Sequence, residues 1–431
     1  MSDVAISTKP LRFSRERLHV PVLAAITVAT GVGAGLGGMS LDLLLHAVQH
    51  LAYGYSQRYL VGPESFLAGV RAASPLRRIA VLEVCGLVAG VGWWAVYRFG
   101  RPLLSIREAA AAGDSRMPPF ATTAHALLQI ITVGLGSPLG REIAPREIGA
   151  LFGGWLARVA QLSTDERRIM LACGAGAGLA AVYNVPLGGA LFVMEVLLRS
   201  FAVPVAIPAL TTSVIAAMVA WIGLGDNSQY ALPHFGISAS LIVWSIIAGP
   251  AFGLGGWCYG RLGRAARRHA SHSASIIVWC AVVFSLIGLL AVRFPGFLGN
   301  GKGPFQLGLD GQVSVGLAVA LLVLKFAGTI GSLRAGASGG LLTPGLSIGA
   351  LTGIVLGAAW SHVWPLVPSG AFAIVGATAF LAVSMQMPIT AVVLVFEMTR
   401  AGYGYLVPVI LAVSGALAAA AFLEQRWQRV Q

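Results

Sequence analysis

The chain contains the stretch Gly174-Ala-Gly-Ala-Gly-Leu-Ala-Ala-Val-Tyr-Asn-Val-Pro186-Leu-Gly-Gly-Ala-Leu-Phe-Val-Met-Glu195, and its pattern returns as Gly376-Ala-Thr-Ala-Phe-Leu-Ala-Val-Ser-Met-Gln-Met-Pro388-Ile-Thr-Ala-Val-Val-Leu-Val-Phe-Glu397. One offset of 202 residues aligns both the prolines and the glutamates of the two copies. An internal repeat in apolar sequence is typical of transporters and channels built from two related halves. Such proteins place the substrate site where the halves meet.

The composition is that of a membrane protein. Only 10% of the residues are charged, 57% are hydrophobic, and the mean hydropathy is +0.80. An ordinary soluble domain carries about 25% charged residues. Several apolar stretches exceed the roughly 20 residues that cross a bilayer. We therefore predict an all-α polytopic protein of the cell membrane (inner or plasma membrane), with no signal-peptide pattern at its polar N-terminus.

The net charge of +13 lies in short basic segments beside the apolar stretches. Basic residues in such places mark the cytoplasmic side, so we expect both termini to be cytoplasmic. No soluble domain carries the charge, which argues against nucleic-acid binding. The basic segments are Lys9, Arg12, Arg15 and Arg17, then Arg261, Arg264, Arg267 and Arg268, which we expect in one loop, and finally Arg426 and Arg429.

The chain divides into two halves at a polar, turn-rich connector, Gly223-Leu-Gly-Asp-Asn-Ser-Gln-Tyr230. We expect a basic cytoplasmic arm over residues 1–18, a first transmembrane half over 19–224, a second over 235–423, and a short cytoplasmic tail over 424–431.

No cofactor or metal site is expected. None of the four cysteines forms a C-x-x-C pair, and all lie in apolar stretches, so we expect them to be buried small side chains. Asp42, His46 and His50 would share one face of a helix. No fourth ligand is near them in the sequence, which favours an interfacial position over a zinc site.

A second repeated pair lies where Gly and Pro interrupt the apolar sequence. Gly140-Arg-Glu-Ile-Ala-Pro-Arg-Glu-Ile148-Gly-Ala-Leu151 corresponds to Gly339-Gly-Leu-Leu-Thr-Pro-Gly-Leu-Ser-Ile348-Gly-Ala-Leu351, with an identical Ile-Gly-Ala-Leu quartet. In each copy a Gly-rich turn and a proline precede a helical run, as suits a helix start. Two helix N-termini aimed at one point would offer free N–H groups and positive dipole ends to an anion.

These residues resemble the CLC family of chloride channels and proton/chloride antiporters. Gly140-Arg141-Glu142 is similar to the start of the family's G-R-E-G-P motif, and Gly340-Leu-Leu-Thr-Pro344 to its G-x-F-x-P motif. The resemblance covers roughly residues 20–423. It implies a CLC-like inverted two-half repeat with many broken, tilted helices, and a homodimer with one anion pathway in each subunit.

By this resemblance Glu142 is the gating glutamate, whose carboxylate occupies an anion position and leaves it when protonated or displaced. The alternative is a structural ion pair of Glu142 with Arg141 or Arg146. The resemblance places the anion beside the two motifs, at Gly140, Arg141, Ile143, Ala144 and Pro145 in the first copy and Gly340, Leu341, Leu342, Thr343 and Pro344 in the second.

The first two departures from the family pattern concern the anion site. The proline of the second motif comes one position late, at Pro145, so the turn after Glu142 is open to a different shape. The segment similar to the family's G-S-G-I-P motif begins Gly100-Arg101-Pro102, so Arg101 stands at the serine position. Ser105 replaces that serine only if the loop slips. Arg101 either attracts anions or anchors the chain at the cytoplasmic face.

Two further departures concern protons and ion coordination. The antiporters carry a proton glutamate one residue after the position of Glu195, and here Val196 stands there. Glu195 is then either a structural residue or a replacement proton carrier. The last helix of the family, with its ion-binding tyrosine, has no counterpart after Phe422. Coordination would then rest on the N–H groups of residues 143–146 and 341–343.

Anion transport is therefore the predicted function, in one of two modes. The first is channel-like, proton-uncoupled passage of chloride, gated by Glu142. The alternative is a proton-coupled antiporter of chloride or another anion with a non-standard proton path. Fluoride and nitrate stay open as substrates, as does a non-conducting, structural or regulatory member of the family. No nucleophile–base pair or nucleotide loop points to an enzyme.

Overall fold

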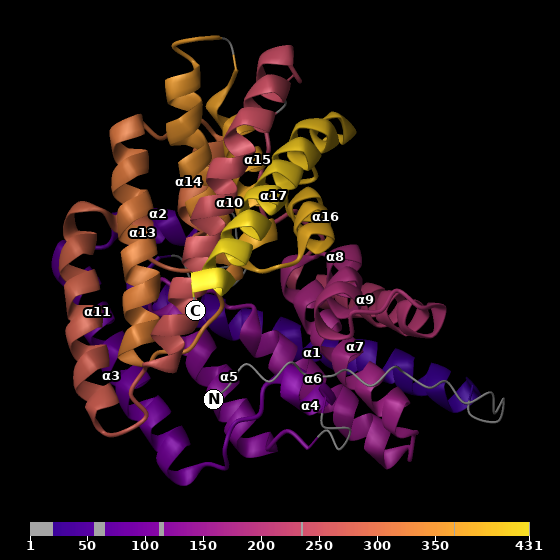
Figure 1. Cartoon of the computed structure of the whole chain (residues 1–431). Helices are drawn as coiled ribbons and strands as arrows, with labels where there is room; N and C mark the ends of the chain where they lie inside the picture. Colours follow the sequence, from indigo (N-terminus) through magenta and orange to yellow (C-terminus); the bar gives the residue numbers. More distant parts are fainter. Residues whose placement is uncertain (1–19, 56–64, 112–115, 234–235, 366, 431) are drawn as a thin grey trace. The chain divides into compact units, whose positions relative to one another are not determined.

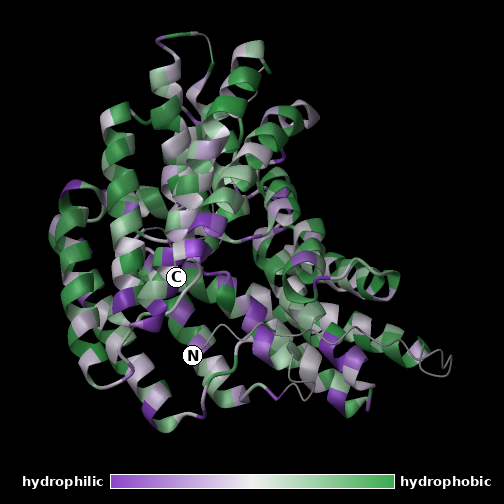
Figure 2. Ribbon diagram, viewed as in Figure 1, coloured by the Kyte–Doolittle hydropathy of each residue, from purple (hydrophilic) through white to green (hydrophobic). Residues whose placement is uncertain are grey.

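The computed structural model describes residues 20–55, 65–111, 116–233, 236–365 and 367–430, which leaves the predicted basic arm outside the described residues. Seventeen α-helices and no β-strand occur in this part of the chain. Eight of its helical segments are long and apolar enough to cross a membrane. Figure 2 shows hydrophobic residues along most of the helix over Ser275–Arg293, one of the eight. The all-α, multi-pass prediction is confirmed.

The chain forms two compact units that alternate along the sequence. The first comprises residues 1–41, 100–126 and 144–226, and the second comprises 42–99, 127–143 and 227–431. Three helices cross a boundary between these ranges: α1 (Val20–Tyr53), α5 (Pro119–Gly134) and α6 (Ile143–Val159). The division into halves at the 225–234 connector stays a prediction.

Within the first unit, the buried helix α7 packs against α8 and α9 (Figure 1). The further elements of this unit are α4 (Ile106–Ala111), α7 (Thr164–Tyr183), α8 (Pro186–Leu191), the π-helix η2 (Phe192–Leu197) and α9 (Val203–Leu224).

Within the second unit, α3 packs against α11, and α14 and α15 form a buried pair beside α10, α13 and α17 (Figure 1). Its further elements are α2 (Phe66–Ala72), α3 (Pro75–Phe99), α10 (Ala239–Arg268), α11 (Ser275–Arg293), η3 (Pro295–Phe297), α12 (Lys302–Leu309), α13 (Val315–Ala335), α14 (Leu342–Trp360), α15 (Ser369–Ser384), α16 (Pro388–Thr399), η4 (Tyr403–Tyr405) and α17 (Leu406–Val430).

The sequence repeat is also a repeat of backbone geometry. Asn184 and Gln386 both adopt a left-handed conformation, with φ of 54° in each case, and each is followed two residues later by a proline that begins a helix. Gly136 and Gly336 both end a helix with a positive φ, at 106° and 109°. Glycine adopts this conformation without the steric cost that a side chain would add.

The repeated motifs pack on one another through glycines. A Cβ on Gly349, in the Ile-Gly-Ala-Leu quartet of α14, would lie 2.6 Å from the carbonyl oxygen of Gly376 on α15. The first copy has the same arrangement, where a Cβ on Gly149 of α6 would collide with the carbonyl of Gly174 on α7. Small residues let membrane helices approach this closely. In each copy, the helix with the Ile-Gly-Ala-Leu quartet therefore crosses the helix that begins the longer repeat, and the two crossings are of the same kind.

One expectation about a chain segment is wrong. The four arginines predicted in one loop, Arg261 to Arg268, lie instead on the last turns of α10, because the alanines and leucine between them continue the helix. Residues 424–430 continue α17, and the short cytoplasmic tail over 424–431 stays a prediction. Glu424 accepts a hydrogen bond of 2.8 Å from the Trp257 indole, and the Trp427 ring stacks under the Arg261 guanidinium, so α10 holds this end of α17.

We predict that Gly349→Ala lowers the free energy of unfolding by about 1–3 kcal/mol, because its methyl group must displace backbone at the α14–α15 crossing. Gly316→Ala is the matched control, because nothing lies within 4 Å of the Cβ position on this helical glycine. Thermal unfolding of both variants in the same detergent measures the difference. Equal midpoints would contradict the role of the crossing.

Candidate anion site

The two Gly-rich turns meet within the second unit. Gly140 and Gly340 exchange both backbone hydrogen bonds, each 2.8 Å long, and form an isolated antiparallel bridge. The turn that contains Gly140 comes from the end of α5, and the turn that contains Gly340 comes from the end of α13. The pairing satisfies backbone groups that would otherwise be buried without partners. It also holds Glu142 beside the start of α14.

The Glu142 carboxylate is the centre of this arrangement. The side chain is 0% exposed, and its Oε1 accepts a hydrogen bond of 2.7 Å from the N–H of Leu342, the first residue of α14. Its Oε2 accepts a hydrogen bond of 3.3 Å from the Thr343 hydroxyl. A negative charge at a helix N-terminus is stabilised by the free N–H groups and the helix dipole. The Glu142 carboxylate is thus the acceptor for the N–H donors at the start of α14.

Glycine is required around this carboxylate for steric reasons. A Cβ on Gly140 or on Gly340 would collide with the carboxylate atoms of Glu142. The absence of side chains at these two glycines therefore leaves the space that the carboxylate fills.

Glu142 does not form the structural ion pair that the sequence left open. The Arg141 guanidinium pairs instead with Asp42 on α1, and Arg146 lies over the ring of Phe192 at 4.2 Å. Among the described residues, the hydrogen-bond partners of Glu142 are Leu342 and Thr343 alone. Its charge is held by backbone and hydroxyl donors, which an anion could use equally well.

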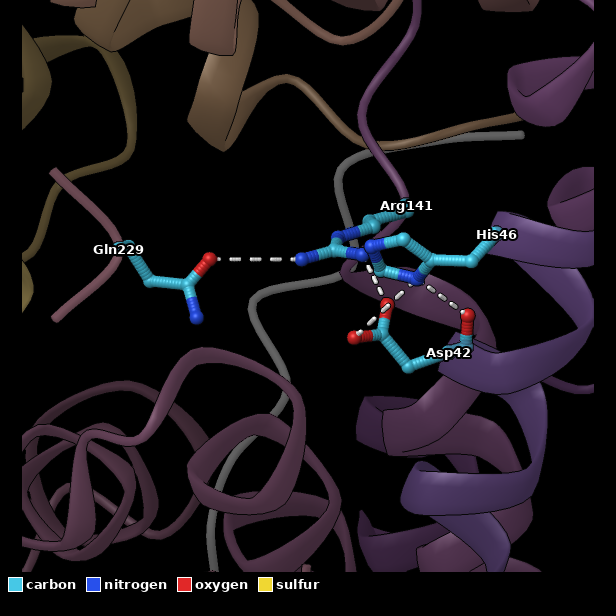
Figure 3. A network of polar contacts seen from close by, with 4 residues as sticks. All are labelled: Asp42, His46, Arg141 and Gln229. Carbon is cyan, nitrogen blue, oxygen red and sulfur yellow. Dashed lines mark hydrogen bonds and ion pairs between the residues drawn. The ribbon is translucent and has the colours of Figure 1, made fainter. Parts of the chain in front are cut away.

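A polar network fixes the residue that precedes Glu142 (Figure 3). Arg141 lies between Asp42 and Gln229, whose Oε1 accepts a hydrogen bond of 3.5 Å from the guanidinium. His46, one turn along α1, has its Nδ1 2.8 Å from the carbonyl oxygen of Asp42. The Asp42 and Arg141 side chains are only 6% and 5% exposed. A buried ion pair of this kind restrains the turn on which Glu142 sits.

The residues considered above as metal ligands have other neighbours in the structure. The described residues contain no cluster of three or more His, Cys, Asp or Glu side chains that could hold a metal ion. Asp42 and His46 belong to the Arg141 network, while the ring of His50 packs on Tyr55 at 4.3 Å. Of the cysteines, Cys258 alone is partly exposed and the other three are buried.

The remaining predicted residues of the two motifs begin helices. Leu341 precedes α14 and Pro344 is its third residue, while Ile143 begins α6 and Pro145 is the third residue there. The two prolines therefore hold the same helical position. The one-residue delay of Pro145 is taken up between Gly140 and the start of α6, since α6 begins three residues after Gly140 and α14 begins two residues after Gly340. Ala144 and Pro145 are buried and belong to the first unit.

The other predicted residues lie in the first unit. Arg101 and Ser105 are exposed ahead of α4. The Ser105 hydroxyl accepts a hydrogen bond of 3.2 Å from the N–H of Glu108, whose carboxylate accepts one of 2.9 Å from the N–H of Ser105. Ser105 is thus the N-cap of α4. Glu195 and Val196 lie in the π-helical η2, with Glu195 half-buried and Val196 buried.

The fold and this site are those of a polytopic helical membrane protein with a carboxylate held at the N-terminus of a helix. The sequence profile of the voltage gated chloride channel family matches residues 85–421. The chain belongs to this family.

Known proteins of the family resemble the chain over nearly its whole length. It is 29% identical to the H(+)/Cl(-) exchange transporter ClcA of Cronobacter sakazakii, covering 95% of this chain and 88% of that protein. The crystal structure of a slow cyanobacterial Cl⁻/H⁺ antiporter matches with a TM-score of 0.80 at 20% identity, over 93% of this chain and 94% of that one. A CLC-type fluoride/proton antiporter matches with a TM-score of 0.68 at 18% identity, over 94% and 96%. The CLC-like fold prediction is confirmed.

We predict that Asp42→Asn lowers the free energy of unfolding by about 3–5 kcal/mol, because it leaves the Arg141 guanidinium buried without its carboxylate. The double variant Asp42→Asn with Arg141→Met removes both charges and is expected to recover much of this loss. Chemical denaturation of the three proteins in detergent gives the coupling energy. A double variant no more stable than Asp42→Asn alone would contradict the importance of the pair.

Proposed function

We propose that this protein transports chloride or another small monovalent anion across a membrane and that Glu142 gates the pathway. The observation that supports this most directly is the Glu142 carboxylate on the Leu342 N–H, at the N-terminus of α14. Displacement of this carboxylate exposes donors that suit an anion. The anion-transport names of the relatives agree with the proposal.

We propose channel-like, proton-uncoupled passage as the mode. A buried valine, Val196, stands where the family's antiporters carry the second proton-transferring glutamate. An aliphatic side chain binds no proton, so the usual coupling route lacks one of its two carboxylates. The mode therefore needs only one titratable gate, Glu142.

Proton-coupled exchange is the second candidate, and the names of the relatives favour it. ClcA of Cronobacter sakazakii and the cyanobacterial protein are both named as exchangers of chloride and protons. In this mode Glu195, half-buried one residue before Val196, is the candidate replacement proton carrier. The fluoride/proton antiporter among the structural relatives keeps fluoride open as the substrate.

The assembly and its orientation are part of the same proposal. We propose a homodimer with one pathway in each subunit and with both chain termini on the cytoplasmic side. Cross-linking of the purified protein in lipid vesicles tests the dimer, and labelling of single cysteines at the two ends tests the orientation.

The deciding experiment follows chloride and pH electrodes together after a potassium ionophore is added to chloride-loaded proteoliposomes. Chloride efflux without proton movement supports the channel-like mode. Efflux that drives protons uphill supports exchange, and the same assay on Glu195→Gln then tests the proton carrier. Absence of both signals, from folded protein and with fluoride and nitrate also tried, would contradict anion transport.

We predict that Glu142→Gln retains anion flux and removes its dependence on pH, because a glutamine side chain does not titrate. The matched control is Glu147→Gln. The Glu147 carboxylate lies 2.9 Å from the Nδ1 of His125, whereas the Glu142 carboxylate lies at the start of α14. Flux from proteoliposomes at a series of pH values measures both variants. Loss of all flux in a folded Glu142→Gln protein would contradict the gating role.

A further inference from the structure

One face of α10 lies along the turn that leads into α14, within the second unit. Tyr259, Gly263 and Arg267 are spaced by four residues, so they share that face. A Cβ on Gly263 would lie 2.8 Å from a Cδ of Leu341. The Arg267 Nη2 donates a hydrogen bond of 2.7 Å to the carbonyl oxygen of Gly339. The sequence alone indicates no role for this face in the anion site.

Tyr259 presents a buried hydroxyl that has no hydrogen-bond partner. The residue is 0% exposed, and its hydroxyl oxygen lacks a partner among the described residues. Its ring edge lies 3.7 Å from the Cβ position of Gly345, in the first turn of α14. The hydroxyl interacts electrostatically with Glu142. A buried hydroxyl without a partner is costly, and its presence calls for an explanation such as an absent ligand.

Thr329 of α13 is a further neighbour of the Tyr259 hydroxyl. The Tyr259 hydroxyl lies near that of Thr329 but outside hydrogen-bond geometry, because Thr329 donates its hydrogen bond, of 3.1 Å, to the carbonyl oxygen of Pro138. Pro138 lies two residues before Gly140, in the turn that leads to Glu142. The phenol group is therefore near Thr329, which contacts the Glu142 turn, and near the first turn of α14.

Arg267 adds a positive charge beside this turn. Its guanidinium has one hydrogen bond, to Gly339, and five N–H donors in total. It interacts electrostatically with both Glu142 and Tyr259. Among the described residues, no carboxylate lies within ion-pair distance of the guanidinium. The residue is exposed, so an anion can reach it from solvent.

We propose that Tyr259 and Arg267 bind the transported anion, the phenol through its O–H and the guanidinium through charge-assisted N–H donors. This inference rests on the proposed transport function and assigns to α10 the side-chain donors of the site. When the Glu142 carboxylate leaves the Leu342 N–H, three groups face the space that the anion enters. These are the N-terminus of α14, the Tyr259 phenol and the Arg267 guanidinium. A small inorganic anion without bulky substituents fits this donor set.

The test is chloride binding, measured by titration calorimetry on the purified protein in detergent. Arg267→Gln is expected to weaken chloride binding by about tenfold, and Tyr259→Phe by roughly threefold to tenfold, as the loss of hydrogen bonds to an anion implies. Arg268→Gln is the charge-matched control on the same helix end. Tyr405→Phe is the control for the phenol, because the Tyr405 hydroxyl is also buried without a partner. Both controls are expected to stay within about twofold of the wild-type value.

The outcomes separate the inference from the function on which it rests. Folded Arg267→Gln and Tyr259→Phe proteins with wild-type chloride affinity overturn the inference and leave transport intact. A wild-type protein that neither binds nor transports chloride, fluoride or nitrate overturns both. Where Arg267→Gln does not fold, Arg267→Lys retains the charge but loses the fork of donors, and a wild-type chloride affinity of that variant overturns the role of Arg267.

Discussion

The close crossing of α14 over α15 at Gly349 and Gly376 is the constraint on which the site depends. All of the first ten residues of α14 are buried, so the position of its N-terminus is set by what packs around it. Backbone contact at the two glycines sets the separation of the helices, and any side chain there would push them apart. The N–H of Leu342, which has no partner within its own helix, is thereby held in protein beside Glu142 and away from lipid.

The charges of the second unit follow from this placement. A helix N-terminus buried in a membrane protein needs an acceptor, and the Glu142 carboxylate supplies one. The turn that carries Glu142 is in turn held by the Gly140–Gly340 bridge and by the Arg141–Asp42 pair. The backbone groups of the bridge and the two charges of the ion pair are costly to bury alone, so each is stable only with its partner.

Lys325 is a further buried charge of the same unit. Its ammonium donates hydrogen bonds to the carbonyl oxygens of Phe297 and Gly299, and its Cε lies 3.3 Å from the Cβ position of Gly301. The carbonyl oxygen of Thr343 lies 2.9 Å from the same Cβ position. Lys325 of α13 and the first turn of α14 therefore both pack against Gly301, the N-cap of α12.

The sequence by itself determined the membrane class, the repeat and Glu142, because these depend on composition and on local spacing. The equal φ of Asn184 and Gln386, and the glycine crossing in both copies, follow from residues that the repeat already aligns. Local spacing also predicted the helix starts beside Glu142. The prediction that the arginines of α10 lie in a loop was wrong, because a basic segment after an apolar stretch is equally compatible with a loop and with the last turn of a helix.

Only the tertiary structure decided which distant residues surround Glu142. The partner of Arg141 is Asp42, 99 residues earlier, and the face of α10 with Tyr259 and Arg267 is more than a hundred residues later. Neither follows from a motif, because such contacts depend on how helices pack and not on the pattern within any one helix. Local chemistry therefore singled out Glu142, and long-range packing selected the side chains that surround it.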